Sequence, residues 1–130
     1  MTLVDTSVWI DHFAHGDARL ADLLTSRWAA LHPFVIGELA AGSIKNRATT
    51  LSDLALLPQA PLANEGEVHY LLQSHHLWST GLGWVDLHLL TATVLKGWTL
   101  LTSDRALKAA AQKLGVAYPE TEIPANRKRG

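Results

Sequence analysis

Short apolar runs that each lead into a helical pattern constrain the fold of this chain most. The run Leu3–Val4 precedes a helix predicted over 7–13, and Trp28–Leu31 and Trp98–Thr102 each precede a further helix. Strands that alternate with helices favour a mainly parallel sheet with helices on both of its faces. The expected fold class is therefore α/β, in three α/β/α layers around a mainly parallel central sheet.

Capping residues, prolines and glycines predict where the other elements begin and end. Asp17 and Asn64 are suited to cap helices, Pro33 to begin one, and Gly42 and Gly97 to end them. The remaining predicted helices cover 17–27, 33 to Gly42, 47–56, Asn64 to Leu72, 84–96 and 104–114. Two further short strands are expected, one between Pro58 and Pro61 and a last one over Val116–Tyr118.

The size and composition fit one domain with one core. The 130 residues are 48% hydrophobic, too many for a disordered chain, and we expect a single domain over 1–118 followed by a tail over 119–130. The absence of cysteine excludes disulfides and thiolate chemistry. No signal peptide or membrane span is visible, so a cytoplasmic location is expected. Most of the five tryptophans are expected in the core or in an interface.

Four acidic residues stand where strands end or helices face the same rim of the expected sheet. Asp5 closes the first apolar run and Asp104 follows the run Trp98–Thr102, while Asp86 opens a long apolar helix and Glu38 lies within another. Ligands of α/β sheets bind at the carboxyl ends of the strands. Each of the three aspartates has an ordinary explanation as a helix cap or a first-turn acid, and Glu38 as a partly exposed helix position.

Together the four acids predict a metal site. Carboxylates gathered on one rim repel one another unless a hard cation binds among them, and no lysine stands near Asp5 or Glu38 in sequence. The pattern therefore points to Mg²⁺ or Mn²⁺, which activates water and offsets phosphate charge in phosphoryl transfer. Hydroxyl groups beside these acids either orient a ligand or cap helices, and capping is the expected role of Thr6, Ser7, Thr102 and Ser103.

Other polar features carry simpler interpretations. The seven histidines, among them His12, His15, His75 and His76, are each expected to be solvated, since no third metal ligand is obvious. Gly81-Leu82-Gly83 is expected to be a loop rather than a nucleotide-binding turn. The formal net charge of −1 excludes a generally basic surface, and the terminal Arg127-Lys128-Arg129 is most simply a solvated end.

Four segments of the chain resemble the motifs of PIN-domain ribonucleases of the VapC type, the toxins of VapBC toxin–antitoxin pairs. They occur in the family's order and cover about residues 1–118. They are Leu3-Val4-Asp5-Thr6-Ser7-Val8-Trp9-Ile10, Val35-Ile36-Gly37-Glu38-Leu39 with Gly42, Gly83-Trp84-Val85-Asp86 with Leu89-Leu90, and Leu101-Thr102-Ser103-Asp104-Arg105.

The resemblance implies a Mg²⁺-dependent endoribonuclease that cleaves RNA phosphodiesters, a homodimer, and a VapB-like antitoxin that occludes the site. Asp5, Glu38, Asp86 and Asp104 are then the catalytic metal ligands, with Asp5 and Asp86 the most direct. The segment Leu87-His88-Leu89-Leu90-Thr91 departs from the Ile-Ala-Ala-type run of many relatives. This departure changes the packing around Asp86 and leaves its carboxylate in place.

Two non-catalytic alternatives remain open. A receiver-like regulatory module would carry a lysine after its last central strand, but here Thr102 is followed by Ser103-Asp104 and the next lysine is Lys108. A degenerate PIN fold could bind RNA or protein without cleavage. Intact acids at all four positions argue against such decay.

Overall fold

The computed structural model describes residues 1–120 and has a small parallel sheet at its centre. The strand order is β2-β1-β3, and both pairings are parallel. The three strands are β1 (Thr2–Val4), β2 (Ala29–Ala30) and β3 (Thr99–Leu101). Within the described residues, no helix is long and apolar enough to cross a membrane.

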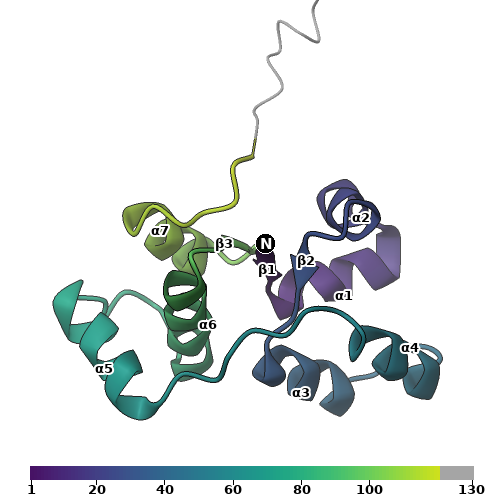
Figure 1. Ribbon diagram of the computed structural model, residues 1–130, viewed down its shortest axis with the longest axis horizontal. Coiled ribbons are helices and arrows are strands. Elements are labelled where there is room, and N and C mark those ends of the chain that lie inside the picture. The colour runs from purple at the N-terminus through teal and green to yellow at the C-terminus, as the bar shows by residue number, and fades with distance from the viewer. Residues whose placement is uncertain (121–130) are drawn as a thin grey trace, which may run out of the picture.

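Helices cover the sheet from both sides, which confirms the predicted fold class. Figure 1 shows the strands in the middle, with α1 to α4 on one side and α5 to α7 on the other. Contacts agree, because α2 packs on β2 while α6 and α7 pack on β3. The helices are α1 (Thr6–His15), α2 (Ala18–Thr25), α3 (Pro33–Ala41), α4 (Arg47–Leu54), α5 (Glu65–Ser74), α6 (Trp84–Lys96) and α7 (Arg105–Lys113).

Local sequence signals set most helix boundaries. Asn64 and Glu67 form a reciprocal capping box at the start of α5, in which each side chain accepts from the other residue's backbone N–H. Gly97 ends α6 with a φ of 68°, in the left-handed region that glycine adopts without strain. These boundaries lie where the caps and stops predict them.

Two predicted strands are reduced to single bridges. Within residues 1–120, Gln59 pairs only with Leu31, and Ala117 pairs only with Leu100. Pro58 and Pro61 flank the first of these sites and lack the N–H that a longer ladder needs. The prediction of strands at 58–61 and 116–118 is therefore wrong in extent, although both segments do lie at the edges of the parallel sheet.

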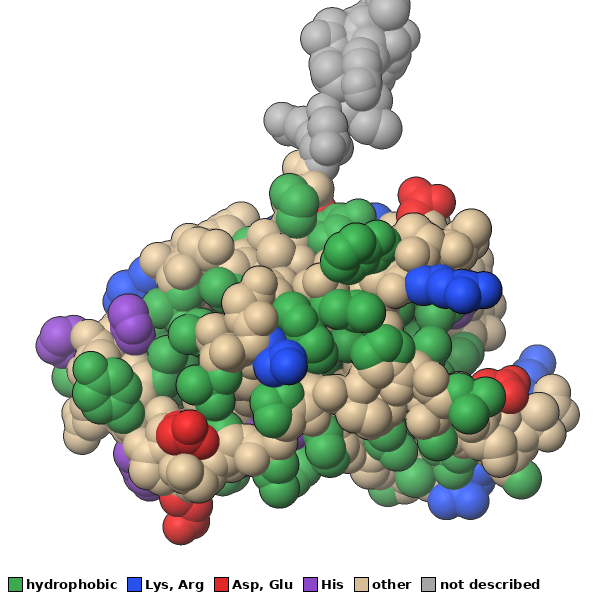
Figure 2. Space-filling view, viewed as in Figure 1, with side chains coloured by type: hydrophobic (Ala, Val, Ile, Leu, Met, Phe, Trp, Pro, Cys, Tyr) green, Lys and Arg blue, Asp and Glu red, His purple; other side chains and the backbone are tan. Residues whose placement is uncertain are grey.

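Three of the five tryptophans lie at the surface of the chain rather than in its core. Only Trp9 is fully buried, whereas Trp28, Trp78 and Trp84 are 54%, 51% and 41% exposed. Figure 2 shows hydrophobic side chains across the middle of one face, with Lys and Arg side chains scattered among them. The core is instead aliphatic, and Leu3 of the central strand is completely buried within it. The terminal Arg127-Lys128-Arg129, expected to be a solvated end, lies outside the residues that the structure describes.

Leu3→Ala tests whether the central strand anchors the domain. Removing a fully buried leucine side chain leaves a cavity, so the free energy of unfolding should fall by about 2–5 kcal/mol. Leu56 is 84% exposed, and Leu56→Ala is the matched control with an expected change within about 0.5 kcal/mol. Urea unfolding of the three proteins measures both effects. Equal losses in the two variants would contradict this assignment of the core.

Candidate active site

Asp5 makes more hydrogen bonds than the other three acids. The Asp5 backbone N–H donates to Leu101 O (2.9 Å), which fixes the end of β1 beside the end of β3. Oδ1 accepts from the Thr6 N–H (2.8 Å) at the start of α1. Oδ2 accepts from the hydroxyls of Thr102 (2.7 Å) and Ser7 (3.1 Å). Asp5 is only 8% exposed, so these bonds offset the cost of burying its charge.

Two hydroxyl groups also connect the ends of β1 and β3. The Thr102 hydroxyl accepts from the Asp104 N–H (3.0 Å) while it donates to Asp5, and the Ser7 hydroxyl accepts from the Ser103 N–H (3.3 Å). The expectation that these hydroxyls cap helices is therefore wrong for Ser7 and Thr102. Their bonds orient the Asp5 carboxylate and tie it to the segment that carries Asp104.

Asp104 and Asp86 each accept a backbone hydrogen bond at the start of a helix. Both also lie on the rim formed by the carboxyl ends of the strands. Asp104 caps α7, where its Oδ1 accepts from the Leu107 N–H (2.9 Å). Asp86 lies in the first turn of α6, and its Oδ2 accepts from the Gly83 N–H (2.9 Å). The capping explanation is thus correct for both residues. It leaves other carboxylate lone pairs available to a ligand.

Glu38 reaches the same region from α3. Its side chain is exposed, as expected for a helix surface position, and it accepts a short hydrogen bond from the Thr6 hydroxyl. Thr6 follows Asp5 directly, so this bond draws Glu38 toward the end of β1. Thr6 therefore acts as an orienting residue for an acid rather than as a helix cap.

Electrostatics show that the four acids influence one another. The pKa of Asp86 is raised above its ordinary value of 3.8, chiefly because burial disfavours the charged form. The negative charges of Asp5, Asp104 and Glu38 raise it further, whereas the hydrogen bond from Gly83 opposes the shift. Three other acids, at the end of β1, on α3 and at the start of α7, thus direct negative charge toward Asp86. Among residues 1–120, none of the four acids forms an ion pair.

The arrangement does not yet form a closed metal cage. No three His, Asp or Glu side chains within residues 1–120 are close enough together to hold one ion directly. At most two of the acids could therefore bind an ion directly as the side chains now stand, and the others would act through water. Mg²⁺ keeps several waters in protein sites and is often held by one or two carboxylates. The donor set is made of carboxylate oxygens that have no ion-pair partner among the described residues, and it fits such an ion.

Two buried histidines contradict the expectation that all histidines are solvated. His32 is fully buried and His88 is 4% exposed, and burial lowers the pKa of His32 to about 4. His32 Nδ1 accepts from the Phe34 N–H (2.9 Å) at the start of α3. The placement of His88 between leucines was the available sequence signal for its burial. His75 and His76 are exposed, as expected.

Comparisons of the sequence with known proteins find matches over most of the chain. The sequence model of the PIN domain family matches residues 2–113. Over 121 residues the chain is 50% identical to Ribonuclease VapC32 of two Mycobacterium tuberculosis strains, which covers 92% of this chain and 98% of that protein.

Two solved structures share the fold at low sequence identity. One is a toxin–antitoxin complex from Klebsiella pneumoniae, with a TM-score of 0.61, 21% identity, and coverage of 80% of this chain and 87% of that one. The other is a protein from Pyrobaculum aerophilum, with a TM-score of 0.59, 18% identity, and coverage of 98% and 93%. These similarities extend over most of each chain and show that the fold is shared.

The raised pKa of Asp86 predicts how stability depends on pH without metal. Below the unfolded value of 3.8 both states hold the proton, so the carboxyl group carries no penalty there. As pH rises through the higher folded pKa, the folded state must ionise a disfavoured carboxyl group and loses stability. Asp86→Asn should remove this loss, so the variant should be more stable than wild type at neutral pH and similar near pH 3.

Urea midpoints in a chelating buffer from about pH 3 to pH 8 measure this difference. Asp53→Asn is the control, because Asp53 is exposed on α4 and lies outside the acid group. A stability gain for Asp86→Asn that does not depend on pH would mean that charge burial is not its cause.

Proposed function

Because this chain belongs to the PIN domain family, and to the VapC-type ribonucleases within it, we propose that it is the endoribonuclease toxin of a toxin–antitoxin pair. The observation that carries the proposal is the convergence of Asp5, Glu38, Asp86 and Asp104 from four parts of the chain. Its substrate is cellular RNA, and the expected place of action is the cytoplasm.

The proposed cofactor is Mg²⁺ or Mn²⁺, held by Asp5 and Asp86 with Glu38 and Asp104 completing the site directly or through water. A bound divalent ion would activate a water molecule and offset the charge of the phosphodiester. The oxygen-only donor set and the absence of an ion-pair partner for these acids within residues 1–120 support this choice.

Hydroxyl groups of the protein orient two of the acids that would bind the ion. The hydroxyls of Thr102 and Ser7 fix the Asp5 carboxylate, and the Thr6 hydroxyl directs Glu38 toward the same rim. Without a cation these acids repel an RNA phosphate, so binding and cleavage both require their charge to be offset. Arg105 begins α7 directly after Asp104 and is exposed, which suits it to contact a neighbouring phosphate.

Asp5→Asn and Asp86→Asn test the catalytic proposal. Each substitution keeps the size of the side chain and removes a charge that a divalent ion needs, so RNA cleavage should fall by at least about a hundredfold. RNA binding should fall less, because phosphate contacts such as that of Arg105 remain. The assay is Mg²⁺-dependent cleavage of purified cellular RNA, with chelator and Asp53→Asn as controls.

Cleavage that persists in Asp5→Asn would place the chemistry elsewhere. Absence of cleavage by the wild type across many RNAs, with RNA binding intact, would instead identify a PIN domain that binds without cutting. The two results separate a wrong site from a wrong activity.

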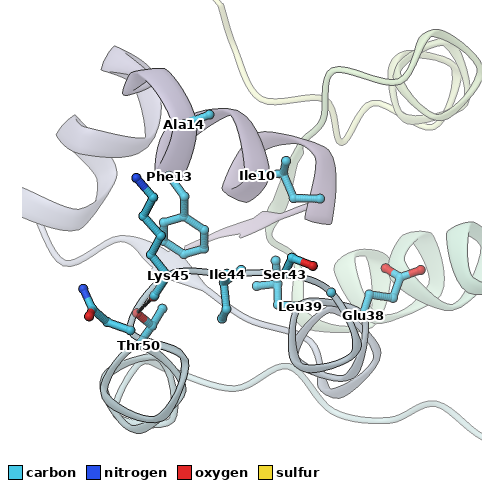
Figure 3. A pocket seen from close by; sticks show the side chains of 11 residues that line it. Ile10, Phe13, Ala14, Glu38, Leu39, Ser43, Ile44, Lys45 and Thr50 are labelled. Carbon is cyan, nitrogen blue, oxygen red and sulfur yellow. Dashed lines mark hydrogen bonds between the residues drawn. The ribbon is translucent and has the colours of Figure 1, made fainter.

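A groove beside the acids is the proposed landing site of the antitoxin. It has a volume of about 710 Å³ and lies between α1, α3 and α4, with Glu38 among its lining residues. Figure 3 shows Phe13 and Ile10 of α1 facing Leu39 and Ile44 across this groove, with Glu38 at one end. Phe13 is 40% and Ile10 is 52% exposed. An apolar segment could cover them and bring a basic side chain to the acids.

Phe13→Glu tests this interface. A charge in an apolar groove opposes the burial that a partner segment requires, so affinity for the antitoxin should drop at least about tenfold. Leu62→Glu is the matched control, because Leu62 is 57% exposed and lines neither groove described here. Co-expression with the small reading frame next to the gene, followed by purification and mass measurement, provides the readout. Equal recovery of complex with both variants would exclude the groove.

The same mass measurement reports on the homodimer that the family resemblance implies. A second apolar groove of about 440 Å³ lies between α5 and α6, and Tyr70, Val94 and Leu95 line it. These three side chains are 75%, 41% and 50% exposed. We propose this face for self-association because its lining is apolar and it lies away from the groove assigned to the antitoxin.

A further inference from the structure

A row of aromatic rings connects α5, α6 and α3. His69 of α5 lies 5.1 Å from Trp84, and Trp84 lies 5.1 Å from His88, measured between ring centroids. His88 contacts Phe34 of α3 at 4.8 Å, and Phe34 contacts His32 at 5.1 Å. His32 and His88 are buried and form the base of this row, whereas Trp84 is 41% exposed. Trp84 therefore exposes part of its ring to solvent, while His69 and His88 hold the ring in place.

Two rings of this row lie on the same helices as two of the acids. Trp84 is the first residue of α6, and the Asp86 carboxylate folds back to the Gly83 N–H just before it. Phe34 lies four residues before Glu38 on α3, so the two side chains share one face of that helix. The exposed Trp84 and the half-buried Phe34 thus lie within about one helical turn, along their helices, of Asp86 and Glu38.

The charge of the protein makes such a surface useful. With a formal net charge of −1 and an acidic rim, the chain has little general attraction for the phosphate backbone of RNA. Base stacking on aromatic rings is the other major source of affinity for single-stranded RNA, and it tolerates sequence variation. An indole held by neighbouring rings also loses little freedom when a base stacks on it.

We infer that Trp84, with Phe34 beside it, is a stacking platform for an unpaired nucleobase next to the phosphate that is cleaved. The inference rests on the proposed function, since it names a substrate contact of the same site. It assigns Trp84 to substrate binding and leaves the chemical step to the acids. The protein should therefore favour unpaired RNA over duplex RNA at this position.

The test measures binding of a short single-stranded RNA to Trp84→Ala and Trp84→Phe in an Asp5→Asn background, so that the RNA stays intact. Trp84→Ala should raise Kd about tenfold, which is about 1.4 kcal/mol, and Trp84→Phe should recover most of the affinity. Trp28→Ala and Trp78→Ala are matched controls, because both side chains are similarly exposed and lie outside the row. Both controls should bind RNA as the parent does.

In the active protein, Trp84→Ala should raise KM by a similar factor and leave kcat within about twofold. A duplex form of the same RNA should bind Trp84→Ala and the parent equally. Unchanged Kd for single-stranded RNA, or an equal loss in the Trp28→Ala control, would overturn the inference. A Trp84→Ala protein with normal RNA affinity but a changed oligomeric mass would also overturn it, because Trp84 would then belong to a protein interface. An inactive wild type whose RNA binding still depends on Trp84 would contradict the proposed cleavage and leave the platform standing.

Discussion

The buried carboxylate of Asp5 is the constraint on which this architecture depends. It lies at the end of the central strand, is only 8% exposed, and has no ion-pair partner among residues 1–120. Hydroxyl donors from Ser7 and Thr102 stabilise the charge and simultaneously join the ends of β1 and β3. A sheet with strands of two or three residues gains little from its own ladder, so these side-chain bonds help to set where its strands end. Folding and site geometry therefore share the same contacts.

The negative charges of the four acids oppose the binding of a phosphate that arrives without a cation. Asp5, Glu38 and Asp104 all raise the pKa of Asp86. Repulsion among these carboxylates therefore costs the folded state free energy. Functional sites commonly retain such costs because a ligand removes them on binding. In this account a divalent ion removes the cost, and aromatic stacking supplies affinity that a protein of net charge −1 cannot draw from general attraction.

Sequence patterns predict the parts of this structure that depend on local rules. The start of α5 at Asn64 and the end of α6 at Gly97 follow from capping chemistry, and parallel pairing follows from the alternation of strands and helices. The convergence of the acids follows from the shared rim of a parallel sheet. Contacts between distant segments follow no such rule. The Thr102 bond to Asp5 spans 97 positions, and the burial of His32 and His88 depends on how α3 meets α6. These features required the structure.

The central claim is that the four acids form one divalent-ion site, and a crystal of the wild-type protein soaked in Mn²⁺ tests it most directly. Anomalous scattering locates the ion without reference to activity. The account predicts one or two peaks at the carboxyl ends of β1 and β3, with an oxygen of Asp5 or Asp86 at about 2.1 Å and the other acids bound directly or through water. A peak at a different part of the surface, with the four carboxylates free of metal, would contradict it.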